Sequence, residues 1–510
     1  MQPSLSEHIL PPLSLLSVDK GKPGVGDIKA NANIIKRTLA NFGIRVEMDE
    51  ISVGPSITRY ALKPAEGVKL ARIVGLQNDL SLALAAHPLR IEAPIPGKAL
   101  VGIEIPNSTK TTVGLGTLLA AAEFQNSDKV VFASLGKGIS GKAQFTNIAK
   151  MPHLLIAGTT GSGKSALIHM IVTSLLYKSP PDKLRFIMVD PKRVELTLYN
   201  KIPHLLTPVI TDPKKAILAL KWAIKEMERR YDILETESVR DIDSYHKNIL
   251  KPAVEAVEDT DDEDAKEGLP EAMPYIVIII DELADIMQAY PRELEAGIVR
   301  LAQMSRAVGI HLILSTQRPS VNVITGLIKA NVPSRIALQV ASQIDSRTIL
   351  DAGGAEKLLG AGDMLFLSGE MSKPQRIQSG YINEDEVKKV VKFLVKSYQD
   401  EIPDEINLES MQKDSNSIFA GSVEDDNDAD DDLYEEARET IVQSGKASTS
   451  YLQRKLRVGY ARAARLIDML EERGVIGPAN GSKAREVYTE GQEDEYEEND
   501  SEDEEEETEQ

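Results

Sequence analysis

The sequence of 510 residues predicts an α/β fold built on a mainly parallel, doubly wound sheet. Two observations predict it. Apolar segments that end in polar residues alternate with helical segments between about 125 and 395. A glycine-rich loop with a lysine separates one such strand from the helix that follows it. A small α+β unit over 26–106 precedes this region, and a compact helical piece over 433–490 follows it.

Each element is predicted from local periodicity. In the first unit, residues 24–43 and 66–86 have helical periodicity, and residues 51–64 alternate as one strand does. Further strands are expected at 89–96, 99–107, 153–158, 185–190, 275–281, 311–317, 335–340 and 363–369. Amphipathic or buried helices are expected at 166–177 and 216–235.

The net charge of −20 is concentrated in three acidic tracts, at 255–267, 424–432 and 493–509. The rest of the chain has 58 basic and 51 acidic residues, so its balance is positive. Such tracts cannot bury enough apolar surface to fold, and we therefore expect them to be disordered. The acidic net charge does not argue against a nucleic-acid partner.

Composition excludes several classes of protein. The absence of Cys excludes disulfides, cysteine nucleophiles and thiolate metal sites. The longest apolar run, Tyr275–Ile280, is far shorter than the roughly 18–20 residues that a membrane span needs. The first residues lack the basic stretch of a signal peptide. A cytoplasmic protein is expected.

A phosphate-binding loop is predicted at Gly158–Ser165, which matches G-x-x-x-x-G-K-[ST]. Backbone N–H groups of such a loop cradle phosphate oxygens, the lysine adds positive charge, and the serine hydroxyl coordinates Mg²⁺. The loop follows an apolar strand and opens an apolar helix, which distinguishes it from an ordinary glycine-rich turn. The residues expected to bind ATP are Gly158, Thr159, Thr160, Gly161, Ser162, Gly163, Lys164, Ser165 and Ala166.

Polar residues at two strand ends complete this expected site. Asp281 is suited to hold Mg²⁺ together with Ser165, and Glu282 is suited to act as general base toward water. The alternative is a pair of solvated strand-end acids, and the phosphate-binding loop upstream favours the metal and base roles. The amide of Gln317 is expected to contact the γ-phosphate or its water, with a backbone hydrogen bond as the alternative.

Arg306 lies just before the strand that ends at Gln317. A guanidinium that reaches the γ-phosphate of a neighbouring copy would stabilise charge in the transition state. The alternative for this residue is an ordinary surface arginine.

The C-terminal piece is predicted to be a winged helix-turn-helix. Its helices are expected at 433–445, 448–456 and 460–473, followed by a glycine- and proline-rich wing. On the third helix, Ala463, Leu466, Ile467 and Leu470 form the apolar stripe. Residues 446–465 contain six basic residues and no acidic one, which suits the major groove of DNA. A basic face with a protein partner or none is the alternative.

These features, with the segments 189–196, 315–340 and 342–366, resemble the FtsK/SpoIIIE family of DNA translocases over about residues 10–490. The resemblance implies a RecA-like P-loop motor domain between a small N-terminal α+β domain and a C-terminal winged helix. It implies an ATP-driven motor that assembles as a homohexamer around double-stranded DNA and acts in chromosome segregation and cell division. The implied boundaries are an arm (1–19), an α domain (20–120), a motor domain (121–400) with an acidic insertion (251–272), an acidic linker (401–432), a γ domain (433–490) and a disordered tail (491–510).

The resemblance also implies roles for single residues. Lys164 and Ser165 would be the Walker A pair, Asp281 and Glu282 the Walker B pair, and Gln317 the sensor. Arg306 falls where related ring motors place an arginine finger that acts on a neighbouring subunit. Contacts with DNA are implied for Arg318, Asn322, Lys329, Arg454, Arg462 and Arg465, and contacts with DNA or a neighbouring subunit for Arg347.

The winged helix would orient loading on DNA and is a candidate surface for a site-specific recombinase. Ala461 stands where the family pattern has Asn, so the DNA sequence that it reads stays open. The family's membrane helices have no counterpart here. One alternative function is a related motor for protein secretion, against which the basic winged helix argues. Another is a DNA-binding regulator that only senses ATP, against which Lys164, Asp281 and Glu282 argue.

Overall fold

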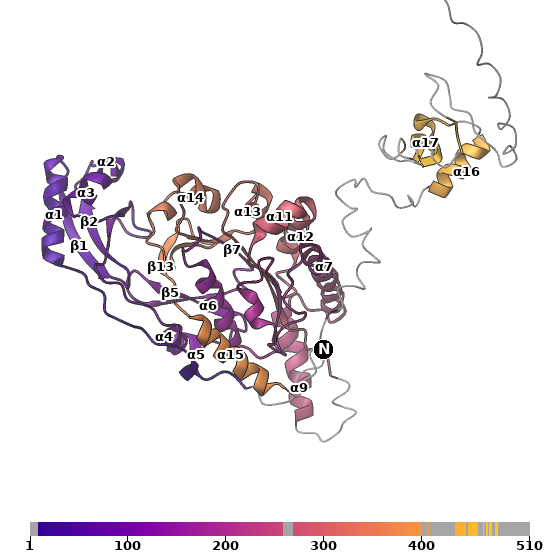
Figure 1. The fold of residues 1–510 in the computed structure, drawn as a ribbon, viewed down its shortest axis with the longest axis horizontal. Helices are drawn as coiled ribbons and strands as arrows, with labels where there is room; N and C mark the ends of the chain where they lie inside the picture. The colour runs from indigo at the N-terminus through magenta and orange to yellow at the C-terminus, as the bar shows by residue number, and fades with distance from the viewer. Residues whose placement is uncertain are drawn as a thin grey trace, which may run out of the picture. The chain divides into compact units, whose positions relative to one another are not determined.

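The computed structural model describes residues 9–258, 269–399 and 406, and, near the C-terminus, residues 434–444, 447–456, 463, 466–467, 469–471 and 475–477. The chain divides into two compact units, Met1–Gly421 and Ser422–Gln510. Within the first unit, Figure 1 shows a small domain with helices α1–α3 beside a larger α/β domain. No helix in the described part of the chain is long and apolar enough to cross a membrane.

The small N-terminal domain is a four-stranded antiparallel sheet covered by helices. Its strand order is β1-β2-β4-β3. The elements are α1 (Ile28–Asn41), β1 (Val46–Val53), β2 (Ile57–Pro64), α2 (Leu70–Gly75), α3 (Gln77–Ala83), β3 (Arg90–Glu92) and β4 (Val101–Pro106). Helix α1 begins at Asp27, whose carboxylate accepts hydrogen bonds from the N–H groups of Lys29 and Ala30. Its apolar stripe packs on the sheet in a core of its own, separate from that of the larger domain.

Two predictions for this domain need correction. Residues 51–64 do not form one strand, because the Gly54-Pro55-Ser56 segment turns the chain and β1 pairs with β2 as a hairpin. The helical stretch 66–86 is divided at Leu76, which ends α2 and caps α3. In both cases the periodicity was right and the short turn was not recognised.

The larger domain is built on a nine-stranded mixed sheet with the order β6-β5-β13-β12-β11-β7-β10-β9-β8. The strands are β5 (Phe132–Gly138), β6 (Ala143–Asn147), β7 (His153–Ala157), β8 (Leu184–Val189), β9 (Tyr275–Ile280), β10 (Ile310–Thr316), β11 (Ser334–Leu338), β12 (Asp363–Leu367) and β13 (Gln375–Gln378). Strands β11, β7, β10, β9 and β8 are parallel, and the other four pair antiparallel. The parallel strands are buried throughout, as their apolar sequences predict.

Helices connect and cover these strands. They are α4 (Leu115–Leu119), α5 (Ala122–Gln125), α6 (Lys164–Leu176), α7 (Pro213–Thr236), α8 (Ile242–Tyr245), α9 (Lys251–Glu258), α11 (Leu283–Ala289), α12 (Pro291–Met304), α13 (Gly326–Asn331), α14 (Gln343–Leu350) and α15 (Glu384–Ser397). Short helical turns are η1 (Leu13–Leu15), η2 (Leu196–Tyr199), η3 (His246–Leu250) and η4 (Ala355–Lys357). Helix α6 packs against α15 and β5, whereas α7, α11 and α12 pack against one another.

The acidic insertion is only partly described. Residues 251–258 form helix α9, so the expectation of disorder is wrong for residues 255–258. Val257 is buried, and Ala253 and Val254 are half-buried, so the helix has a partly buried apolar side despite its acidic composition. Residues 259–268 lie outside the described residues, and so does nearly all of 400–433 and 478–510.

The segment before the N-terminal domain packs on the larger domain. Leu16 is buried in the core of that domain, and the Tyr177 hydroxyl donates a hydrogen bond of 3.0 Å to the Pro12 carbonyl. Asp19 contacts the N–H of Gly114 and the ammonium group of Lys137. Residues 12–19 of the expected arm therefore pack against the larger domain.

The C-terminal unit has a small apolar core of its own. Helices α16 (Tyr434–Ser444) and α17 (Thr449–Leu456) are described, together with helical positions of a third segment. Ala463, Leu466, Ile467 and Leu470 are all buried, as their spacing on one helical face predicts. Each of these residues packs in the same cluster as Ile441 and Leu452 of the first two helices.

Candidate nucleotide-binding site

The loop Gly158–Gly163 lies at the carboxyl end of β7 and leads directly into α6, which begins at Lys164. Gly163 has a φ of 103°, in the left-handed region that favours glycine. A Cβ atom at this position would lie 2.4 Å from the backbone nitrogen of Gly362, so the site also has no room for one. The Gly362 N–H donates to the Ser162 carbonyl at 2.8 Å, and the turn at Gly360–Gly362 thus supports the loop through this hydrogen bond.

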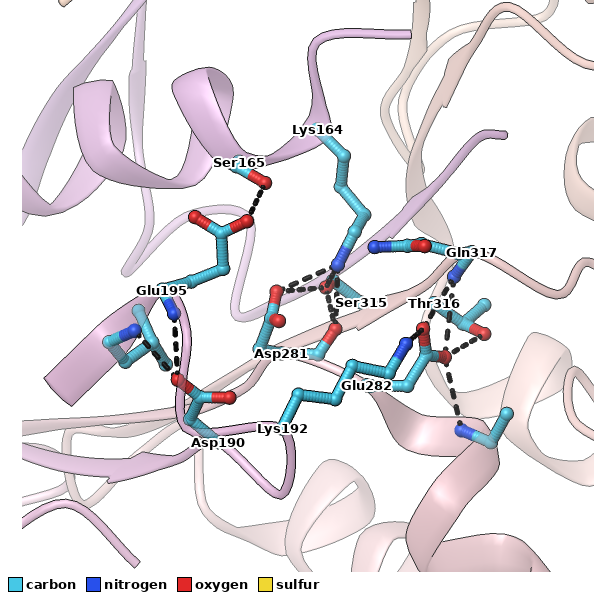
Figure 2. A network of polar contacts seen from close by, with 12 residues as sticks. Lys164, Ser165, Asp190, Lys192, Glu195, Asp281, Glu282, Ser315, Thr316 and Gln317 are labelled. Carbon is cyan, nitrogen blue, oxygen red and sulfur yellow. Dashed lines mark hydrogen bonds and ion pairs between the residues drawn. The ribbon is translucent and has the colours of Figure 1, made fainter. Parts of the chain in front are cut away.

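Parallel pairing brings the carboxyl ends of β7, β10, β9 and β8 to one edge of the sheet. The segments that follow these strands carry the other candidate residues. Figure 2 shows Lys164 extending from α6 toward Asp281, which follows β9. Its Nζ donates to Asp281 Oδ1 at 2.7 Å, to the Asp281 carbonyl at 2.9 Å and to Ser315 Oγ at 3.0 Å.

Asp281 is almost completely buried. Burial raises the pKa of its carboxyl group, and the nearby acids Asp190 and Glu195 act in the same direction. Lys164 opposes them by its charge and its hydrogen bond. The ammonium group of Lys164 therefore supplies the positive charge that compensates the buried carboxylate of Asp281.

The Ser165 hydroxyl donates a 2.6 Å hydrogen bond to Glu195 Oε1, from the segment after β8. The hydrogen bond from His169 holds the pKa of Glu195 below its ordinary value, against the effect of burial. Asp190 Oδ2 accepts the N–H groups of Glu195 and Leu196, each at 2.9 Å. Asp190 Oδ1 is buried and has no hydrogen-bond partner among the described residues. Hydroxyl and carboxylate oxygens are the ligands that Mg²⁺ prefers, so this donor set fits Mg²⁺.

Glu282 lies at the N-terminal end of α11, and its side chain is completely buried. The Thr316 hydroxyl donates to Oε1 at 2.7 Å, and Lys192 Nζ donates to Oε2 at 3.1 Å. The Gln317 N–H lies 3.2–3.3 Å from both oxygens. Burial alone would raise the pKa of Glu282, but these hydrogen bonds outweigh it and lower the pKa.

Gln317 follows β10 and faces the phosphate-binding loop. Its Oε1 accepts a 3.0 Å hydrogen bond from the Thr160 hydroxyl, while its N–H contacts Glu282. This one residue therefore connects the loop with the carboxylate expected to act as base. Figure 2 shows Gln317 and Glu282 together with Lys164 and Asp281 around one space.

The structure places Arg306 elsewhere. It is exposed in the turn between α12 and β10, at the amino end of β10, whereas the phosphate-binding loop follows the carboxyl end of β7. The two strands are parallel, so Arg306 and the loop lie at opposite edges of the sheet. A strand of seven residues spans about 23 Å, and Arg306 does not reach the nucleotide site of its own chain.

Four other candidate residues lie in or near the segment that follows β10. Arg318 and Asn322 are exposed, and Arg347 is exposed on α14. Lys329, on α13, forms a 2.7 Å ion pair with Asp351. A partner could therefore reach Arg318, Asn322 and Arg347 directly. Lys329 would first have to break its ion pair with Asp351.

The three candidates of the C-terminal unit are not testable in this structure. Arg462 and Arg465 lie outside the described residues, and the side chain of Arg454 does too.

Sequence reasoning missed three residues of this site, namely Asp190, Lys192 and Glu195. All three lie in the segment after β8, which is the strand next to β9. The signal that could have found them is the same one that pointed to Asp281. Polar side chains directly after neighbouring parallel strands meet at one edge of the sheet.

Comparison with known proteins gives three consecutive matches. Residues 10–107 match the FtsK alpha domain, residues 115–321 match the FtsK/SpoIIIE family, and residues 428–490 match the Ftsk gamma domain. The match at 115–321 contains the phosphate-binding loop, Asp281, Glu282 and Gln317.

Several curated relatives are similar over most of this chain. The DNA translocase FtsK of Clostridium tetani is 49% identical over 491 residues, which cover 94% of this chain and 62% of the relative. The DNA translocase SpoIIIE of Bacillus subtilis is 48% identical over 484 residues, with coverages of 94% and 60%. The chain thus spans about three fifths of the length of these relatives.

Among solved structures, the conjugation coupling protein TcpA of pCW3 aligns with a TM-score of 0.47 at 23% identity, covering 71% of this chain and 99% of its own. The three sequence matches follow one another along the chain. They fall on the N-terminal domain, the larger domain and the C-terminal unit, each of which has its own apolar core. The chain belongs to the FtsK/SpoIIIE family.

Proposed function

We propose that this chain is an ATP hydrolase that moves along double-stranded DNA and acts in chromosome segregation and cell division. One observation carries the proposal. Lys164, Asp281 and Glu282 lie close together beside a phosphate-binding loop. The chain belongs to a family in which the similar relatives are DNA translocases. A buried lysine, a buried metal-binding carboxylate and a second carboxylate beside them are the groups that phosphoryl transfer to water requires.

The residues have separate tasks in this proposal. The N–H groups of the loop and the ammonium group of Lys164 bind the phosphates. Mg²⁺, held by Ser165 and Asp281, supplies positive charge at the terminal phosphates when it is bound. Glu282 accepts a proton from the attacking water, and Gln317 orients that water or senses the γ-phosphate.

Arg306 belongs to the site of a neighbouring copy in this proposal. Its exposure and its place at the opposite edge of the sheet support an action outside its own chain. A ring of six copies would put each Arg306 against the nucleotide of the next subunit. The arginine would then stabilise charge that develops on the phosphate in the transition state.

We also propose two groups of DNA contacts. Arg318, Asn322, Lys329 and Arg347 would contact the DNA backbone without regard to sequence, which a motor that moves along DNA needs. Arg454, Arg462 and Arg465 would contact bases and phosphates from a winged helix that orients loading. The buried stripe of Ala463, Leu466, Ile467 and Leu470 supports a third helix that packs on the first two.

The domain boundaries proposed are 20–120, 121–400 and 433–490, with the second domain RecA-like. The separate apolar cores support this division into three regions, but residues 113–119 pack in the core of the second domain and favour a start before 121. The proposed location is the cytoplasm, and a site-specific recombinase is the proposed partner of the winged helix.

The test is steady-state ATP hydrolysis by the purified chain with and without linear double-stranded DNA at moderate salt. We expect strong stimulation by the duplex. Stimulation by unfolded polypeptide in place of DNA would indicate a protein-secretion motor. Intact hydrolysis with no response to either polymer would contradict the proposed function.

A further inference from the structure

Both oxygens of the Glu282 carboxylate accept hydrogen bonds from other residues of the chain. Oε1 accepts the Thr316 hydroxyl at 2.7 Å and also lies 3.4 Å from the Ala284 N–H. Oε2 accepts Lys192 Nζ at 3.1 Å, and the Gln317 N–H contacts both oxygens. A general base must point a lone pair at the water that it deprotonates. At least one of these contacts therefore has to be given up before Glu282 can act.

We propose that Lys192 is a positioning residue that restrains Glu282, and that hydrolysis of bound ATP requires its ammonium group to leave the carboxylate. The inference rests on the proposed ATP hydrolysis and adds a control to the same site. Lys192 itself takes no part in proton transfer. The proton of the attacking water goes to Glu282 once the oxygen is free.

Lys192 is the contact best suited to leave. Its side chain is 36% exposed, whereas Thr316 is completely buried in β10. The contacts from residues 284 and 317 come from the backbone, at the first turn of α11 and the end of β10. A lysine carries its charge on a flexible four-carbon stem, so its ammonium group can move without displacing any element.

The surroundings of Lys192 give a reason for bound nucleotide to weaken its contact with Glu282. The ammonium group faces Glu282 and, at 4.0 Å, Asp285. A phosphate chain in the neighbouring loop brings several negative charges into the same space, and these compete for the ammonium group. Gln317 touches both the loop, through Thr160, and Glu282, so the loop and the carboxylate are already in contact through one residue.

The experiment compares kcat and KM for ATP hydrolysis, without DNA and with linear duplex, in Lys192→Met, Lys192→Arg and the parent chain. We expect Lys192→Met to raise kcat without DNA about tenfold, the change that loss of one hydrogen bond to a charged group produces. Lys192→Arg should behave as the parent chain does, since it keeps the charge and the donor.

Two controls separate the restraint from other effects. Lys201→Met removes an exposed lysine from the same connection between β8 and α7 and should leave kcat unchanged. The double variant Lys192→Met with Glu282→Gln should lose all turnover. Turnover that persists in the double variant would show that the rise does not pass through Glu282, and would overturn the inference.

An unchanged or reduced kcat of Lys192→Met without DNA would also overturn it, because Lys192 would then assist hydrolysis or have no part in it. Lys192→Ala replaces the methionine variant if that protein does not fold, as judged by the fluorescence of Trp222. The parent chain tests the proposed function in the same assay. If it does not hydrolyse ATP with or without DNA, the proposed function fails. If it does and the variant shows no rise, only the restraint fails.

Discussion

Replacement of Arg376 by methionine should lower the free energy of unfolding of the motor domain by about 3–5 kcal/mol. Arg376 lies on β13 and is almost completely buried. Its Nε and Nη2 donate to Asp363 on β12 at 3.0 and 2.6 Å, and its Nη1 donates to Glu104 of the N-terminal domain at 2.8 Å. Removal of the guanidinium leaves two buried carboxylates without that charge. Breaking a buried pair in this way costs about 3–5 kcal/mol.

The pKa of Glu104 gives a second value, of similar size, for the stability that these ion pairs contribute. Burial alone would raise this pKa, but Arg90, Arg376 and Arg59 lower it from 4.5 to about 2. A carboxyl group with this difference between folded and unfolded states contributes about 3 kcal/mol of stability. The contribution is fully present above pH 4.5 and is lost as the pH falls toward 2. Arg376 supplies part of it, and the buried charge of Asp363, left without its partner, adds to the cost of removing Arg376.

The assay is urea denaturation at pH 7.5, followed by the fluorescence of Trp222. This residue is the single tryptophan of the chain and lies on α7 of the motor domain. Lys388→Met is the matched control, because Lys388 pairs with Glu384 on the solvent-facing side of α15 and should not change the urea midpoint. A loss below about 1 kcal/mol for Arg376→Met would refute the reasoning that the two carboxylates depend on it.

Three further predictions concern the site, acid stability and the C-terminal unit. Glu282→Gln should still bind ATP but lose at least about 100-fold in kcat, and Lys164→Ala should lose ATP binding; normal turnover in either variant would contradict the site. His153, His204 and His311 are buried with pKa values lowered by burial to about 4, 3 and 3. They stay neutral in the folded chain, so stability should fall as the pH drops below about 6.5, by about 2 kcal/mol for each of them at pH 5. Urea midpoints measured between pH 8 and 5 test this, and the exposed His87→Gln should leave the slope unchanged. Removal of residues 433–510 should preserve hydrolysis stimulated by DNA but abolish dependence on DNA sequence, and loss of all stimulation would contradict this division of tasks.

The central sheet was predictable because its strands are buried on both faces. All six strands expected in the larger domain are present as β7 to β12, and the middle four are parallel, as expected. Strands β5, β6 and β13 were missed. They carry polar and glycine residues such as Gly136 and Gln378, which interrupt the apolar pattern. The pairing of β13 with β5 also joins distant parts of the chain, which no local pattern reveals.

The candidate site was predictable where a motif fixes both residue type and position. Lys164, Ser165, Asp281, Glu282 and Gln317 do lie around one space, because a phosphate-binding loop and two strand ends share an edge of the sheet. The strand-end pattern also points to the segment after β8, but not to the individual contacts in it. Which side chain turns toward Ser165 or Glu282 depends on the path of a loop, so the pairing of Glu195 and Lys192 with them was not predictable.

Each polar group of this site is paired within the chain, and this has a consequence for nucleotide binding. Lys164 has Asp281, Ser165 has Glu195, and Thr160 has Gln317. A buried polar group without a partner lowers the stability of the fold by about 1–3 kcal/mol, so these pairs stabilise the folded site. A nucleotide that enters must exchange these partners one for one, and its affinity reflects the difference between the two sets of contacts. Asp190 Oδ1 and Ser162 Oγ are exceptions among the described residues of the site, because both atoms are buried and have no hydrogen-bond partner. The charge of Asp190 acts on Asp281, and a bound cation would gain from that charge without displacing a partner of Oδ1.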